Sequence, residues 1–599
     1  MSFRSAVTKL QAVVAIVIII VAVAGGAYYF SSTMAPTTTT MVSSSMVSSS
    51  MVASTSAAGA TIVVDAPAIA DTLDPAVAWH AQAYEADQNI YQGLISYAPN
   101  SNQMVPLIAQ NFTVSPDGLT YKFWLRQNVV FSNGDPVNAY EFWYSIYRVV
   151  VMNQGPAYYI TATGMNVSGI TAAMLNEYNT TNDIPPPGLM SIMENPNLGL
   201  TVTGQYSLEF HLPAPFAAFL ALATQPQDTV VDPLVVSEHG GVQKNAPNTW
   251  MFGNALGTGP FIETDYEPNT QLVLQANTNY WGGANGIQPA PKLAKVIYKL
   301  VPDALTRLED VEGGSAQLAY VDFTLASQLK TASNVYVPQL GPMPVVHWLE
   351  FNTYKFPFNN PLIRQAVVHA INATALDTMY GGYATPFAGP NPKGVSGYNS
   401  SLPSAYSYDP TLAEQLLAKA GYPGGKGIPP LRLEFSTDRT PESYVVPLIA
   451  SELSQIGLTV NTVGTTISNF DTFLGGTPPT SASYPEMMYV TWFWFPDPWA
   501  FADWLAGPLG IPNPNFGGYN NTVVNALLAQ ADKTSNMAER ALLYEHISEI
   551  VYEDAPCDWV AQYQNALPLG LPVANTKLQG FTYNLQFAQT DASTLYLTG

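Results

Sequence analysis

One stretch of the chain, Leu10–Phe30, is uncharged, mostly apolar and long enough to cross a bilayer, which needs about 20 residues. No other stretch has this length and character, although 47% of the 599 residues are apolar. The rest of the chain must therefore bury its apolar side chains within itself, in a large globular core. At roughly 100–200 residues per domain, the length predicts two to four domains.

The apolar stretch also predicts where the protein lies. Positive charges precede it, and such charges stay on the cytoplasmic side of a membrane. We therefore expect residues 1–9 to lie in the cytoplasm, residues 10–30 to form a single-pass transmembrane anchor, and the rest to be extracellular. Residues 31–60 are uncharged, rich in Ser and Thr and repeat the sequence MVSSS, which predicts a flexible stalk. The alternative is a signal peptide cleaved after Ala24, which would release a secreted protein.

Charge excludes one large class of partners. The chain has 43 acidic and 21 basic residues and a net charge of −22, so it lacks the basic surface that nucleic-acid binding requires. Charged residues make up only 11% of the chain, against about 25% in ordinary proteins. In acid, where carboxylates are protonated, such a chain would carry little positive charge to repel itself. The composition therefore favours an acidic external medium.

The patterns of catalytic and metal-binding chemistry are missing. The single cysteine, Cys557, excludes an internal disulfide and a cysteine-rich zinc site. The six histidines are not at metal-ligand spacing, and the chain has neither a G-x-S-x-G nucleophile motif nor a phosphate-binding loop. We therefore expect no catalytic residues, no metal and no cofactor, and predict that the protein is not an enzyme. Two alternatives stay open: a surface-anchored glycoside hydrolase, which needs only two facing carboxylates, and a surface-layer or adhesion protein.

Six N-x-S/T sequons follow the apolar stretch and predict a glycoprotein. All of them fall on the side predicted to be extracellular: Asn111, Asn166, Asn179, Asn372, Asn399 and Asn520.

The globular part mixes helical and strand-like patterns, which predicts an α/β fold. Residues 361–371 and 410–420 have apolar positions at helical spacing, and each stretch begins with proline directly after a capping residue, Asn360 or Asp409. Residues 525–553 predict one further helix with mixed charges. Residues 121–125 are aromatic and predict a strand.

Several segments, taken in order, resemble a known family: the extracellular solute-binding proteins of ABC importers, family 5, of the oligopeptide/dipeptide-binding type, which include archaeal members that bind oligosaccharides. The densest match runs from Val105 to Ala139 and contains DGLTYKFWLR. The other matching segments are Leu73-Asp74-Pro75, Tyr91–Leu94, Gly257–Phe261, Asn279–Trp281, Asn352–Ala370 with Arg364-Gln365-Ala366, Ala413–Tyr422 and Asp497-Pro498.

The resemblance implies an architecture and partners. It implies a type II periplasmic-binding-protein-like clamp of the large family 5 variant, in which two α/β lobes close on a ligand. We expect the chain to cross between the lobes near 301–303 and 561–567, so that residues 61–300 plus 561–599 form lobe I and residues 301–560 form lobe II. The implied partners are a small-molecule ligand, an ABC permease and its ATPase subunits, with the binding protein acting as a monomer.

The sequence predicts a ligand other than the peptides after which this family type is named. Peptide-binding members carry an acid three residues before the late Asp-Pro, where it pairs with the peptide amino group; here that position is Trp494. A buried ammonium without a partner costs several kcal/mol, so the exchange favours a neutral ligand with flat apolar faces. We predict an oligosaccharide, with an oligopeptide as the alternative. The predicted ligand-binding residues are Trp494, Trp492, Trp499, Trp79 and Asp497, although the tryptophans would also suit a packed core.

Overall fold

The computed structural model describes residues 59–178, 184–283, 288–437, 439–511, 513–584 and 589–598. The predicted cytoplasmic segment, transmembrane anchor and almost all of the stalk lie outside the described residues, as does the sequon at Asn179. Among the described residues, no helix is both long and apolar enough to cross a membrane.

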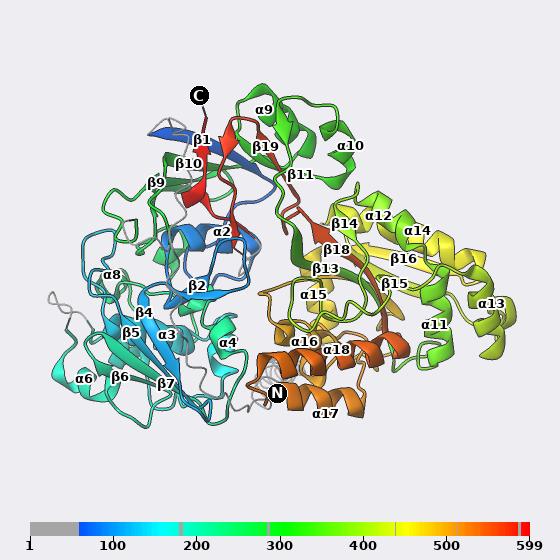
Figure 1. Cartoon of the computed structure of the whole chain (residues 1–599), viewed down its shortest axis with the longest axis horizontal. Helices are drawn as coiled ribbons and strands as arrows, with labels where there is room; N and C mark the ends of the chain where they lie inside the picture. The colour runs from blue at the N-terminus through cyan, green and yellow to red at the C-terminus, as the bar shows by residue number, and fades with distance from the viewer. Residues whose placement is uncertain are drawn as a thin grey trace, which may run out of the picture.

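Two mixed sheets form the centres of two lobes that lie side by side (Figure 1). In the first lobe, β1 pairs in parallel with both β10 and β11, whereas the outer strands are antiparallel to their neighbours. The order of this seven-stranded sheet is β12 (Val335–Tyr336), β19 (Leu571–Asn575), β11 (Leu318–Val321), β1 (Ala60–Ala66), β10 (Leu293–Leu300), β9 (Gln271–Ala276) and β8 (Phe261–Glu267).

The first lobe contains a second layer built on a four-stranded antiparallel sheet. Its strands are β4 (Ala109–Val114), β5 (Thr120–Leu125), β7 (Ser207–His211) and β6 (Leu200–Gly204), and β5 confirms the strand predicted at residues 121–125. Helix α3 (Ala139–Met152) packs on this sheet, where the Trp143 indole donates to the Leu200 carbonyl at 3.0 Å. The elements that face the second lobe are α2 (Ala81–Ile90), the hairpin of β2 (Ile95–Tyr97) and β3 (Met104–Pro106), and α4 (Ala157–Thr161) (Figure 1).

The second lobe is built on a six-stranded sheet. Its strand order is β14 (Ala384–Thr385), β18 (Cys557–Gln564), β13 (Pro342–Phe351), β17 (Met487–Phe493), β15 (Leu431–Ser436) and β16 (Val460–Thr465). Its main helices are α11 (Pro361–Ala370), α12 (Ala373–Met379), α13 (Pro410–Lys419), α14 (Thr440–Gln455), α15 (Ile467–Gly476), α16 (Ala502–Leu505), α17 (Thr522–Ala531) and α18 (Met537–Asp554). Helices α11, α12, α13 and α14 lie on the side of the sheet away from the first lobe, whereas α15 and α16 lie on the side toward it (Figure 1).

Capping residues determine where several helices of the second lobe begin. Asn360 accepts from the backbone N–H of Leu362 and begins α11, and Asp409 accepts from that of Leu412 and begins α13, as predicted. The single helix expected over residues 525–553 is wrong: the chain forms α17 and then α18. Asn536 causes the break, because its side chain accepts from the backbone N–H of Ala538 and starts a new helix.

The chain changes sheet later than the predicted crossing at 301–303. After β10, helix α9 (Ala304–Gly313) returns the chain to the other side of β1, where β11 joins the same sheet. Arg307 of α9 fixes this crossover by donating to the carbonyls of Val301 and Tyr320. The change to the second lobe falls between β12 and β13, and the return falls between β18 and β19. We therefore define the first lobe as the described residues up to 336 and from 571 onward, and the second lobe as residues 342–564.

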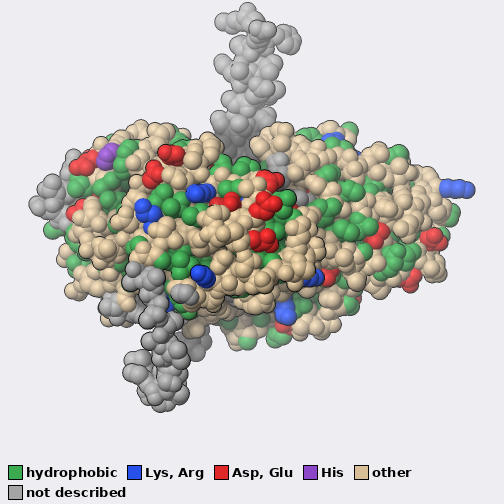
Figure 2. Space-filling model, turned by 90° about the horizontal axis from the view of Figure 1, so that it is seen from above, with side chains coloured by type: hydrophobic (Ala, Val, Ile, Leu, Met, Phe, Trp, Pro, Cys, Tyr) green, Lys and Arg blue, Asp and Glu red, His purple; other side chains and the backbone are tan. Residues whose placement is uncertain are grey.

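The surface carries few charges. Figure 2 shows one face on which Lys, Arg, Asp and Glu side chains are scattered sparsely among apolar and uncharged polar ones. This agrees with the low content of charged residues in the sequence, 11%.

Candidate ligand site between the lobes

Aromatic rings from both lobes meet where the lobes touch. From the first lobe come Tyr158 and Tyr159 of α4; from the second come Trp494, just after β17, and Trp504 of α16. The Tyr159 and Trp494 ring centroids are 5.2 Å apart, and those of Tyr158 and Trp504 are 5.4 Å apart. In Figure 1, α4 lies at the border of the first lobe, next to α16. We call these four residues, with Trp79, Trp492 and Trp499, the interlobe aromatic cluster.

The structure brings all four predicted tryptophans into this cluster. Trp494 is 8% exposed and its ring lies 5.2 Å from Trp492 and 5.7 Å from Trp499. Trp492 is half-buried, and its indole donates to the Ala500 carbonyl at 3.0 Å. Trp499 is fully buried and contacts Phe216 of the first lobe, with ring centroids 5.8 Å apart.

Trp79 reaches the cluster from the first lobe. Its ring stacks on Tyr159, with centroids 5.4 Å apart and planes 20° apart, and the residue is 44% exposed. Gly155 allows this placement, because a Cβ at that position would lie 3.2 Å from the Trp79 ring. Tyr159 therefore joins the two tryptophans that the sequence assigns to opposite lobes, Trp79 and Trp494.

Asp497 forms an ion pair with Arg540 within the second lobe. Its two carboxylate oxygens accept from the two terminal nitrogens of Arg540 at 2.8 and 2.9 Å, and one of them also accepts from the backbone N–H of Trp499. Both side chains of the pair are almost fully buried. The pair fixes the loop that carries Trp494 and Trp499, so Asp497 positions the cluster, and its predicted contact with a ligand stays a prediction.

A series of interacting polar side chains lies beside the aromatic cluster in the second lobe. The Thr491 hydroxyl donates to Glu442 and lies 2.8 Å from Nδ1 of His347. Arg439 follows β15, lies 3.7 Å from Glu442, and donates to the Thr491 carbonyl at 3.5 Å. Burial and the Arg439 charge hold the pKa of His347 well below its usual value, so its ring is neutral. Burial raises the pKa of Glu442 to about 7.

Arg439 brings positive charge to the edge of the tryptophan strand. Its side chain is 33% exposed, and it borders Thr491, the residue before Trp492. A guanidinium offers a fork of donors that matches a carboxylate. Arg439, Tyr158, Tyr159 and Trp504 are not among the site residues predicted from the sequence. The one sequence signal for the tyrosines was their adjacency behind Gly155-Pro156.

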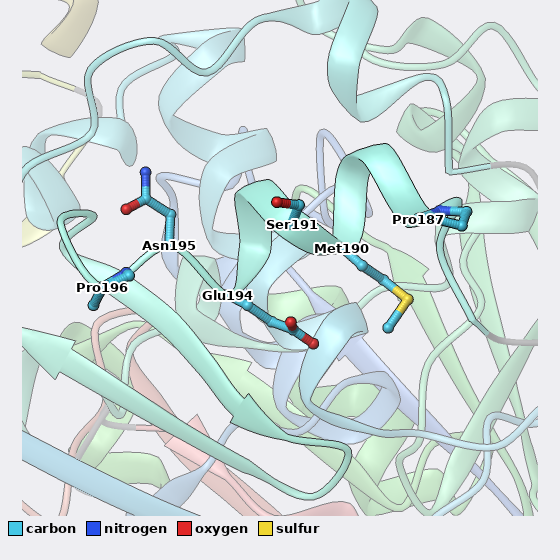
Figure 3. Close-up of a pocket in the computed structure, with 6 residues that line it drawn as sticks. All are labelled: Pro187, Met190, Ser191, Glu194, Asn195 and Pro196. Carbon is cyan, nitrogen blue, oxygen red and sulfur yellow. The ribbon is translucent and has the colours of Figure 1, made fainter.

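Two hollows elsewhere share no residue with the aromatic cluster. One, of about 610 Å³, is an open depression over α6 (Pro187–Met193) on the first lobe, lined by Pro187, Met190, Ser191, Glu194, Asn195 and Pro196 (Figure 3). The other, of about 60 Å³, runs along α2 and reaches Tyr97. Among the described residues, no group of three or more His, Cys, Asp or Glu could hold a metal ion.

Comparison with known proteins identifies the family. A family model described as bacterial extracellular solute-binding proteins, family 5 Middle, matches residues 103–513. The chain belongs to the family 5 extracellular solute-binding proteins. This confirms that it is a substrate-binding protein of ABC transport rather than an enzyme, and places its globular part among extracellular proteins.

Relatives cover nearly the whole globular part of this solute-binding protein. The chain is 26% identical over 508 residues to the glutathione-binding protein GsiB of Escherichia coli K12, covering 83% of this chain and 88% of GsiB. It is 27% identical over 532 residues to the heme-binding protein A of Haemophilus influenzae, covering 85% and 88%.

Solved structures confirm the α/β two-lobed fold. The periplasmic binding protein DppA of Helicobacter pylori, in complex with the peptide STSA, superposes with a TM-score of 0.69 at 25% identity, covering 90% of this chain and 98% of DppA. The murein tripeptide binding protein MppA of Escherichia coli superposes with a TM-score of 0.68 at 22% identity, covering 91% and 99%.

Proposed function

We propose that this protein captures a small organic ligand between its two lobes and presents it to the permease of an ABC importer. The observation that carries the proposal is the run of rings Trp79–Tyr159–Trp494, which crosses from one lobe to the other. Aromatic side chains offer large, rigid apolar faces. A ligand held among these rings would contact both lobes at once and so stabilise their closed arrangement.

For the ligand we propose a short peptide recognised through its carboxylate and its apolar side chains. Arg439, beside the strand of Trp492, provides the positive charge that a carboxylate needs. The relatives and neighbours reported above are named for glutathione, heme and peptides. Since Trp494 stands where peptide binders carry an acid, the amino group of the peptide would be bound elsewhere or not at all.

The second candidate is an oligosaccharide. The same exchange at Trp494 favours it, because sugar C–H faces pack on rings and require no charged partner. The two candidates differ in their need for Arg439.

A thermal-shift screen separates them. The panel contains di- and tripeptides, the same peptides as C-terminal amides, and di- and oligosaccharides, tested on the wild type and on Arg439→Gln. We expect peptides to stabilise the wild type, by about 2.7 kcal/mol at 100 times the dissociation constant, and their amides and the Arg439→Gln variant to show little effect. Sugars that stabilise both proteins equally would favour the second candidate. Release of shorter products from either ligand would contradict a binding function.

We also propose that residues 10–30 hold the protein at the membrane and that residues 31–60 act as its stalk, with the monomer as the working form. The apolar length of the first segment and the composition of the second support this. Mass spectrometry of the mature N-terminus tests it, since a chain that begins after Ala24 would have lost its anchor.

Glycosylation belongs to the same proposal. Asn111 and Asn520 are exposed, whereas Asn399 is 4% exposed and its amide donates to the Glu545 carbonyl. In the folded protein we therefore expect sugar at Asn111 or Asn520 and none at Asn399, which glycopeptide mapping tests.

A further inference from the structure

Three carboxyl groups and one guanidinium are buried together in the second lobe, behind the aromatic cluster. None of the four residues is more than 4% exposed: Asp497, Asp503, Asp532 and Arg540. If all were ionised, the group would carry two uncompensated negative charges among buried side chains. Such an arrangement is strongly unfavourable unless protons neutralise part of it.

The geometry shows which acids lack a cation. Arg540 is matched by Asp497, whose two oxygens it contacts with both terminal nitrogens. The Tyr544 hydroxyl donates to Asp503 at 2.7 Å and lies 3.3 Å from Asp532. A hydroxyl has one proton and cannot serve both acids fully. Asp503 and Asp532 therefore face each other across Tyr544 with no positive charge of their own.

Electrostatics agree with this geometry. Burial raises the pKa of Asp503 to about 7, and burial together with the charge of Asp503 raises the pKa of Asp532 well above its usual value. Two acids in such contact behave as a pair that holds one proton over a wide pH range. The other titratable groups that act on the pair are Asp497, Arg540 and Tyr544 from the second lobe. From the first lobe, Tyr97 and Tyr121 face Arg540.

The acid pair is directly linked to the contact between the lobes. Asp503 and Trp504 are neighbours in the short helix α16, and Trp504 packs on Tyr158 of the first lobe at 5.4 Å. The Trp504 ring also lies 5.4 Å from Trp494. A displacement of α16 would therefore move the rings that join the lobes.

We propose that Asp503 and Asp532 share one proton when the lobes are in contact, and that its release to solvent as pH rises displaces α16 and loosens the interlobe aromatic cluster. The release leaves two carboxylates facing each other, and their repulsion is relieved only by separation or by entry of water. The pair thus acts as a pH-sensitive positioning device, which favours capture in acid and release at higher pH. Its effect on capture rests on the proposed function; its effect on the rings does not.

The test uses the tryptophans as reporters and requires no ligand. Tryptophan emission and the melting temperature are measured from pH 5 to pH 9 for the wild type, Asp532→Asn and Asp503→Asn. Asparagine keeps the size and hydrogen-bonding capacity of a protonated acid without its charge. We expect the emission of the wild type to shift to the red as the pair loses its shared proton, at a pH well above the usual range of a carboxyl group. Both variants should lose this red shift, and their melting temperatures should fall less steeply with pH than that of the wild type.

Asp228→Asn is the matched control. Asp228 is a buried acid of the first lobe, whose pKa burial raises to about 8, and its contact is with Gln227 rather than with the cluster. This variant should keep the emission transition of the wild type. A wild type whose emission is constant across the range would overturn the proposal, and so would an Asp532→Asn protein that titrates like the wild type. A constant wild-type emission overturns the proposal even where a variant fails to fold.

Ligand affinity is a separate measurement. With a ligand from the thermal-shift screen, affinity should fall over the pH range in which the emission shifts, by at most about tenfold per pH unit, the limit for one linked proton. It should stay constant in Asp532→Asn. Equal wild-type affinity at pH 5 and pH 9 would overturn the link to capture while leaving the binding function intact. If no ligand binds at any pH, the proposed function fails. The emission titration still tests whether Asp503 and Asp532 share a proton and release it as pH rises.

Discussion

The ring of Tyr159 in the first lobe lies 5.2 Å from the ring of Trp494 in the second lobe. This contact joins the lobes at Trp494, one of the ligand-binding residues predicted from the sequence. Trp494 is 8% exposed because rings surround it on several sides, and Trp492, Phe495, Trp499 and Trp504 complete its environment. The residue is thus part of a packed cluster and part of the contact between the lobes, and both roles affect how a variant behaves.

We expect Trp494→Ala to weaken ligand binding at least tenfold, or about 1.4 kcal/mol, and to lower stability as well. Tyr159→Ala should have the same direction of effect. Because the rings touch, the double variant should lose less than the sum of the two, with a coupling of about 0.5–1.5 kcal/mol in thermal unfolding. The control is Trp250→Ala, because the Trp250 ring stacks on His239 within the first lobe, with ring centroids 3.8 Å apart. Its loss of stability should simply add to that of Trp494→Ala in the double variant. Additive effects of Tyr159 and Trp494 would show that the lobes do not meet through these rings.

Part of this site could be predicted from the sequence and part could not. Trp494 was found because a motif fixes its position relative to Asp497, and the exchange of acid for tryptophan is visible in the letters. Tyr158 and Tyr159 lie in α4, a helix of only five residues, which has no periodicity to mark a face. Arg439 follows a strand and is distant in sequence from the tryptophans, so only the pairing of β15 with β17 brings it beside them.

The fold, too, could be predicted only in part from the sequence. Capping residues predicted the starts of α11 and α13 correctly, because a cap acts on its own helix. The crossing predicted at 301–303 failed because α9 and β11 follow residue 301 without leaving the first sheet. Whether a strand returns to its own sheet depends on pairing with β1, more than two hundred residues earlier. Such long-range pairing leaves no local pattern.

The motif glycines Gly257 and Gly259 allow two backbone segments to approach closely. A Cβ at Gly257 would lie 2.1 Å from the Ile90 carbonyl oxygen, and one at Gly259 would lie 2.5 Å from that of Asn89. We therefore expect Gly257→Ala and Gly259→Ala to destabilise the protein by roughly 1–3 kcal/mol through overpacking, measured by chemical denaturation. Gly188 of α6 has open space around it, so Gly188→Ala should be neutral or slightly stabilising. Equal stability of all three variants would contradict the close approach.

The Leu-Asp-Pro motif has a structural role that can be measured. Asp74 and Arg148 form a bidentate ion pair, in which the two terminal nitrogens of Arg148 donate to the two carboxylate oxygens of Asp74 at 2.9 and 2.5 Å. Both side chains are fully buried. Removing one partner leaves the other charge buried and alone, so Asp74→Ala should cost about 3–5 kcal/mol of stability. The partly exposed pair of Lys122 and Glu209 provides the comparison, and Glu209→Ala should cost less than about 1 kcal/mol. Similar losses in the two variants would argue against a buried pair.

Buried acids throughout the molecule predict that the protein is more stable in acid. Burial raises the pKa of Asp228 and Glu350 to about 8, and that of Glu85 and Asp558 to about 7. In the unfolded chain these groups titrate near pH 4, so between about pH 4 and pH 8 the folded protein holds protons that the unfolded chain has lost. Their stabilising contribution is complete below about pH 4 and is lost as pH rises through 7 to 8.

We therefore expect the melting temperature to fall steadily from pH 5 to pH 8, as an acidic medium would favour. Glu350→Gln removes one of the titrating groups while keeping an acceptor for the backbone N–H of Gly517, so its melting temperature should fall less steeply than that of the wild type. Exchange of an exposed acid such as Glu267 should leave the slope unchanged. A wild-type melting temperature that rises from pH 5 to pH 8 would contradict this account, because it would mean that the folded state binds fewer protons than the unfolded chain.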